Sequence, residues 1–166
     1  MAYDFGHMGD NHDENGSLSR EQRRQLAVDL FNHAWTLIEL PERTPEQDDE
    51  MIHAAHASRA HWGEVGTRAN LARGEWQVSR VYTVLRRSEP ALYHAHRCLA
   101  YVEEGDGVED WDLPFAFEAL ARAHALAGDL GESLRYETLA REAGEGIADD
   151  EDRDHLMAAL ATLPGR

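Results

Sequence analysis

Hydrophobic residues recur at intervals of three and four along almost the whole chain from Ser19 onward. This spacing places apolar side chains on one face of an α-helix, whereas a half-buried strand alternates apolar and polar residues. In the first such segment the apolar stripe contains Leu26, Leu30, Leu37 and Ile38. No segment alternates convincingly, so the sequence predicts an all-α protein.

Capping and turn residues divide this pattern into about seven helices. Ser19, followed by Gln22 three positions later, is a capping-box pattern that opens a helix. Pro41 and Pro45 bracket the next turn, and Gly128-Asp129 marks a later one. The predicted helices span residues 19–40, 46–62, 67–87, 89–103, 112–127, 131–144 and 150–162.

The short connections predict that consecutive helices pack antiparallel. The expected pairs are 19–62, 67–103 and 112–144, with 150–162 as a capping helix, in one domain that covers residues 18–166. Residues 1–17 are rich in Gly, Asp, Asn and His and have no periodicity. We expect this stretch to be a disordered acidic tail.

Two helix pairs share a pattern of small and large residues. The third pair reads Leu120-Ala121, His124, Gly128-Asp129, Ser133 and Ala140, and the second repeats the scheme through Val78-Ser79, Tyr82, Ala91-Leu92 and Cys98-Leu99. Small residues at these positions let neighbouring helices approach closely. This spacing resembles a tetratricopeptide repeat in a degenerate form. The resemblance implies a superhelical array of helix pairs. Because proteins with such repeats are typically adaptors, it also implies a non-enzymatic module that binds proteins.

The charge balance excludes several classes of partner. Of 166 residues, 32 are acidic and 16 are basic, which gives a net charge of −16. Such a chain is poorly suited to displace counterions from nucleic acid or to adhere to anionic lipid, so we expect neither partner. All the basic residues are arginine, which excludes lysine-dependent Schiff-base and Walker-type chemistry. The single cysteine, Cys98, excludes an internal disulfide and favours a cytoplasmic protein.

The middle of the chain is instead rich in arginine. Seven arginines lie between Arg59 and Arg97, against three acids. The inner helices of a helix-pair array line a concave face that binds extended peptides, and guanidinium groups fork onto carboxylates. We therefore predict a groove for a protein or peptide with acidic side chains or a carboxy-terminal carboxylate. The predicted groove residues are Asn70, Arg73, Glu75, Arg80, Tyr82, His94 and Arg97. The alternative is that these arginines form structural ion pairs.

Glu75 falls on the inward side of its predicted helix together with Leu71 and Tyr82. A buried carboxylate needs a partner or a raised pKa. The candidate partners are Arg59, Arg80 and Arg97. The resulting network would be either the floor of a polar pocket or a structural salt bridge.

The ten histidines raise the question of a metal site. No HExxH motif or facial-triad spacing is present. His56, Glu75 and His94 could still meet across helices, which is the alternative hypothesis of a metal-dependent or acid/base enzyme. Cys98 lies among apolar residues and is interpreted as part of the core. We assign no catalytic residue and no cofactor, and prefer a binding or scaffold module in which an end pair could mediate homodimerisation.

Overall fold

The structure is a computed structural model and describes residues 17–164. Within this range the chain forms seven α-helices and no strand, which confirms the predicted fold class. The helices are α1 (Arg20–Ile38), α2 (Pro45–Val65), α3 (Arg68–Val84), α4 (Ser88–Glu103), α5 (Asp112–Ala127), α6 (Leu130–Gly144) and α7 (Asp150–Ala161). The predicted tail lies outside the described residues except for Ser17. No helix in the described range has an apolar run long enough to span a membrane.

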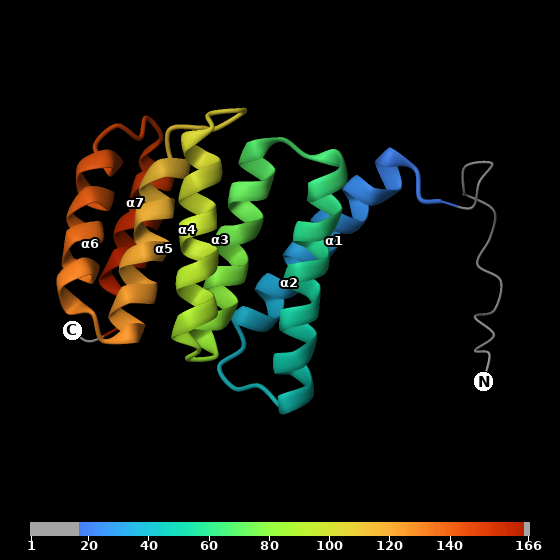
Figure 1. Cartoon of the computed structure of the whole chain (residues 1–166), viewed down its shortest axis with the longest axis horizontal. Coiled ribbons are helices and arrows are strands. Elements are labelled where there is room, and N and C mark those ends of the chain that lie inside the picture. Colours follow the sequence, from blue (N-terminus) through green and yellow to red (C-terminus); the bar gives the residue numbers. More distant parts are fainter. Residues whose placement is uncertain (1–16, 165–166) are drawn as a thin grey trace.

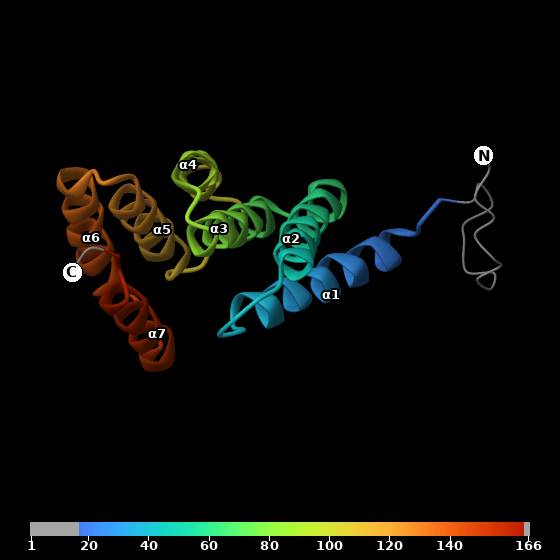
Figure 2. The ribbon, with the colours of Figure 1, turned by 90° about the horizontal axis from the view of Figure 1, so that it is seen from below.

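Consecutive helices pack side by side in an array (Figure 1). The pairs α1–α2, α3–α4 and α5–α6 have the most extensive contacts, and α7 leans on α5 and α6. Figure 2 shows α2, α4 and α6 on one side of the array and α1, α3, α5 and α7 on the other, with α1 and α7 projecting beyond α3 and α5. We call this second side the concave face. Because α3 also packs against α1, α2, α4 and α5, it is the central helix.

Local sequence signals set the helix ends. Three helices begin with a capping box, in which the cap side chain and the third helical residue exchange hydrogen bonds. These boxes pair Ser19 with Gln22, Thr44 with Gln47 and Thr67 with Asn70. The predicted Ser19 cap is therefore confirmed. Gly128 ends α5 with a left-handed φ of 81°, and the side chain of Asp129 then caps α6.

Small side chains occupy the contacts between neighbouring helices. The hydroxyl of Ser58 on α2 donates to the carbonyl of Ala27 on α1 (2.7 Å), and that of Ser79 on α3 donates to the carbonyl of Ala91 on α4 (2.9 Å). A side chain at Gly74 would place its Cβ 2.8 Å from Cδ of Arg59, so α3 meets α2 at a position that requires glycine. These close contacts leave no room for large side chains between the helix axes.

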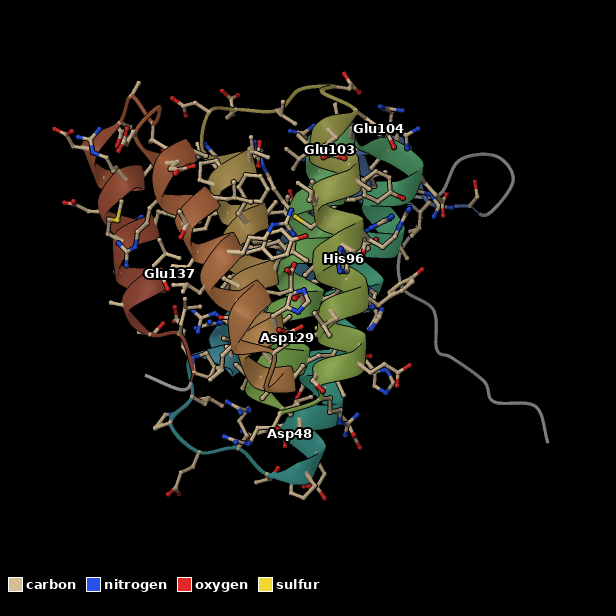
Figure 3. All side chains as sticks on the ribbon, turned by 60° about the vertical axis from the view of Figure 1, so that its left-hand side comes forward. Asp48, His96, Glu103, Glu104, Asp129 and Glu137 are labelled. Atoms are coloured by element: carbon tan, nitrogen blue, oxygen red, sulfur yellow. The ribbon has the colours of Figure 1, made fainter. Side chains whose placement is uncertain are left out.

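Acidic side chains gather at helix ends and in loops. Asp48 lies in the first turn of α2, Asp129 caps α6, and Glu103 and Glu104 mark the end of α4 (Figure 3). The carboxylate of Glu104 lies 2.5 Å from Nε of Arg68, at the start of α3. Acids in a first turn interact favourably with the helix dipole.

A buried arginine attaches α7 to the array. Arg122 on α5 is only 4% exposed and donates from Nε to Oε1 of Glu118 at 2.6 Å. Its other nitrogens donate to the carbonyls of Ala159 (2.6 Å) and Thr162 (3.0 Å) at the end of α7. The ion pair of Glu118 and Arg122, four residues apart on α5, thus also caps a neighbouring helix.

Arg122→Met should destabilise the protein strongly, because it leaves Glu118 buried without its counter-charge and removes the guanidinium donors from the carbonyls of Ala159 and Thr162. We expect a loss of about 3–5 kcal/mol in the free energy of unfolding, measured by urea denaturation. Arg135→Met is the matched control, since Arg135 pairs with Glu132 on the exposed surface of α6. It should leave stability nearly unchanged. Equal losses in the two variants would contradict this role for Arg122.

Candidate functional site

Aromatic rings form a continuous row across the concave face. Phe31 and Trp35 come from α1, Trp76 from α3 and Phe115 from α5, and Trp111 is the residue directly before α5. Successive ring centroids are 6.5, 5.3, 5.6 and 6.2 Å apart in that order. All five side chains are half-buried. This aromatic row presents apolar surface to a ligand, with a rigid geometry that aromatic contacts favour.

Three hollows open along the aromatic row. The first, the Cys98 pocket, has a volume of about 180 Å³, and its walls include Ala72, Arg73, Trp76, Cys98, Trp111 and Phe115. The second, the Arg80 pocket, has a volume of about 270 Å³ and is lined by Trp35, Trp76, Arg80, Phe115, Glu118, His155 and Ala159. The third lies between α1 and α3 and is lined by Val28, Phe31, Asn32, Trp62, Asn70 and Arg73. Shared walls join the three into one groove.

Arg73 is neutralised within the groove. Its Nε and Nη2 donate to the two carboxylate oxygens of Asp112 at 2.9 and 2.8 Å. Its guanidinium also lies over the ring of Trp111, with Cζ 4.2 Å from the centroid. A bidentate, stacked arginine of this kind is held in one orientation. Arg73 is therefore a fixed wall of the groove, and its charge is already compensated.

Arg80 differs from Arg73 because it has no partner. The side chain is half-buried in its pocket and forms no hydrogen bond or ion pair with any residue from 17 to 164. Nearby Glu118 is bonded to Arg122 and accepts from Nε1 of Trp76 at 3.5 Å. Burial, and secondarily the charge of Arg122, lower the pKa of Arg80, while Glu118 opposes the shift. The groove thus contains one guanidinium whose five donors are unused.

A second polar cluster lies between α2, α3 and α4. Glu75 is 6% exposed, accepts from Nε of Arg59 at 2.8 Å, and has its other oxygen 2.6 Å from Nδ1 of His94. The hydroxyl of Tyr101 accepts from both Arg59 (3.1 Å) and Arg97 (2.6 Å). Of the three candidate partners of Glu75, Arg59 bonds to it, whereas Arg80 and Arg97 do not. His94 is a second partner, which the sequence had brought together with Glu75 only in the alternative metal site.

These contacts shift two pKa values. Burial alone would raise the pKa of Glu75, but the hydrogen bond from His94 and the charge of Arg59 outweigh it and lower the pKa. The pKa of His56 is lowered by burial and, secondly, by the nearby His94, although Glu75 partly opposes this. The folded protein therefore favours an ionised Glu75 and a neutral His56.

The structure divides the predicted groove residues between two sides of the array. Asn70, Arg73 and Arg80 line the groove on the concave face. The others belong to the cluster between α2, α3 and α4, namely Glu75, Tyr82, His94 and Arg97. Successive helical residues turn by about 100°, so positions two apart point in nearly opposite directions. The arrangement of these rings as one row was not predicted, although Phe31 and Trp35 on α1, and Trp111 and Phe115 at the start of α5, are each four residues apart.

The three residues of the alternative metal site do lie close together, but their polar atoms are engaged. The rings of His56 and His94 are 5.3 Å apart, and Nε2 of His56 lies 3.0 Å from the hydroxyl of Tyr82. Both oxygens of Glu75 have partners. Among residues 17–164, no group of three His, Cys, Asp or Glu side chains is arranged to hold a metal ion. Burial raises the pKa of the Cys98 thiol, which disfavours the thiolate.

The protein is an array of helix pairs whose concave face is lined by aromatic rings. No family model, curated protein or solved structure matches this chain. We therefore infer its function from the chemistry of the groove.

The neutral His56 should make stability depend on pH. As the pH falls from about 7.5 to about 5.5, the unfolded chain takes up a proton that the folded protein resists, so the free energy of unfolding falls. His56→Gln should reduce this fall, as measured by urea denaturation at the two pH values. A residual fall should remain, because burial also lowers the pKa of His96. His53→Gln, at an exposed position of the same helix, removes only the smallest of the effects that lower the pKa of His56 and should nearly retain the wild-type dependence. An identical effect of both substitutions would refute the assignment.

Proposed function

We propose that this protein is a non-enzymatic binding module whose groove holds an extended segment of a partner protein, with an acidic side chain of that segment bound to Arg80. The observation that carries the proposal is the unpartnered guanidinium of Arg80 among the rings of Trp35, Trp76 and Phe115. A half-buried cation without a counter-ion is costly. A carboxylate that forks onto it would compensate the charge and use its donors.

The remaining charges of the groove support a ligand with few charges. Arg73 is paired with Asp112, and Glu118 with Arg122. Arg80 is therefore the unbalanced cation at the centre, while Asp152 borders the Cys98 pocket. The chain as a whole carries a net charge of −16, which repels a strongly acidic ligand. We infer a segment that is mostly apolar and contains a single carboxylate.

An acidic side chain is a better match than a carboxy-terminus. The groove continues from the Arg80 pocket into the Cys98 pocket and the hollow between α1 and α3. A segment that runs along the aromatic row can therefore use several subsites, as extended peptides do on concave helical surfaces. The resemblance to tetratricopeptide repeats agrees with this mode of binding.

Binding can be tested with two fluorescein-labelled peptide libraries, both amidated at the carboxy-terminus. One has a fixed aspartate among random neighbours, and the other has asparagine at that position. The wild-type protein should bind the aspartate library more tightly, as measured by fluorescence polarisation. Arg80→Gln should weaken that binding by about tenfold or more, because it removes a charge-assisted hydrogen bond, and should abolish the preference for aspartate.

Arg87→Gln is the matched control. Arg87 is exposed in the connection between α3 and α4 and forms no side-chain hydrogen bond or ion pair within residues 17–164. The substitution removes the same charge outside the groove, so binding should stay at the wild-type level. The proposal fails if neither library binds, or if Arg80→Gln binds like the wild type.

A further inference from the structure

We propose further that the groove recognises two residues of the bound segment that are separated by one intervening residue. A phenyl-sized apolar side chain enters the Cys98 pocket, and the carboxylate bound by Arg80 belongs to the residue two positions away. This inference rests on the proposed function and specifies the sequence that the groove selects.

The Cys98 pocket has the size and chemistry for one aromatic side chain. Its volume is about 180 Å³, and an engineered apolar cavity of about 150 Å³ is known to hold benzene. The rings of Trp76, Trp111 and Phe115 contribute its walls, together with the fully buried Cys98. Edge-to-face contacts with such walls favour an aromatic guest.

The charged side chains around this pocket already compensate each other and do not favour the binding of a charged side chain. Arg73 and Asp112 neutralise each other through two hydrogen bonds, and Arg73 is further held by its stacking on Trp111. Asp152, from α7, adds a negative charge at the same pocket. A second carboxylate would therefore be repelled here, whereas an apolar side chain would only lose contact with water. The two pockets consequently select different side chains.

The distance between the pockets sets the spacing of those side chains. Trp76 and Phe115 line both pockets, so the two sites are adjacent. Along α3 the contacts shift from Ala72 and Trp76 in the first pocket to Trp76 and Arg80 in the second. Four helical residues correspond to about 6 Å. In an extended peptide, residues two apart lie about 6.7 Å apart and point to the same side, whereas direct neighbours point to opposite sides.

A peptide panel tests the spacing. Each peptide is fluorescein-labelled and amidated, and contains one phenylalanine and one aspartate in a glycine–serine background. The two residues are adjacent, separated by one residue, or separated by three, in both orders. Peptides with one intervening residue should bind about tenfold more tightly than the others in fluorescence polarisation, and replacing their phenylalanine by alanine should cost a similar factor.

Variants of the pocket provide the matched test. Cys98→Met adds volume to the wall of the pocket and should weaken binding of the phenylalanine peptide without affecting its alanine counterpart. Cys98→Ala enlarges the pocket and should improve the binding of a tryptophan peptide relative to phenylalanine. The second variant keeps the test valid if the first fails to fold, which urea denaturation would reveal. Arg80→Gln should weaken the binding of the phenylalanine peptide and of the alanine peptide by the same factor.

The possible failures are distinguishable. If binding depends on aspartate and Arg80 but is indifferent to spacing and to phenylalanine, the two-residue reading is wrong and the proposed function stands. If no peptide binds, the proposed function fails as well. If peptides bind only after dilution dissociates a dimer detected by light scattering, the groove is occupied by a second copy of the chain, and a partner segment is not its occupant.

Discussion

The close approach of neighbouring helices is the constraint on which the rest of the structure depends. Gly74 meets the side chain of Arg59, and the hydroxyls of Ser58 and Ser79 reach carbonyls on adjacent helices. Large side chains cannot occupy these contacts. The rings of Trp35, Trp76 and Phe115 instead contact one another along the concave face, between the projecting helices α1 and α7 of the curved array (Figure 2). Packing that stabilises the fold thus also shapes the proposed binding surface.

The charged side chains on the two sides of α3 differ in whether they have partners. Toward α2 and α4, Glu75 is satisfied by Arg59 and His94, and every member of that cluster has a partner. A buried network of this kind joins three helices and leaves little for a ligand to bind. Toward the groove, Arg73 is also paired, whereas Arg80 is left alone beside a carboxylate that belongs to Arg122. This contrast within one helix is the basis for the proposed role of Arg80.

The local features of the fold could be predicted from the sequence, whereas the division of α3 into two faces could not. Capping boxes and Gly-Asp turns act over three or four residues, so Ser19 and Gly128-Asp129 located helix ends correctly. The central helix is apolar on several sides because neighbours surround it, and its pattern therefore does not indicate which side faces which neighbour. Burial and charge predicted a partner for Glu75 and left Arg59, Arg80 and Arg97 as candidates, of which the structure shows Arg59. Its bond to His94 depends on the register of α3 against α4, which no local pattern encodes.

Two electrostatic effects act on a ligand in the groove, one at long range and one at contact distance. Together they restrict the number of charges that the ligand can carry. Acidic side chains at the helix ends and in the loops, such as Glu103, Glu104 and Asp129, create a negative field around the molecule (Figure 3). Salt screens this field beyond about 8 Å at physiological ionic strength, so it acts chiefly on ligands with many charges. Arg80 acts at contact distance in a half-buried pocket, where screening is weaker. The negative field disfavours a segment with many acidic residues. A wholly apolar segment would not gain the contact with Arg80. The proposed segment, with one carboxylate two positions from an aromatic residue, satisfies both conditions.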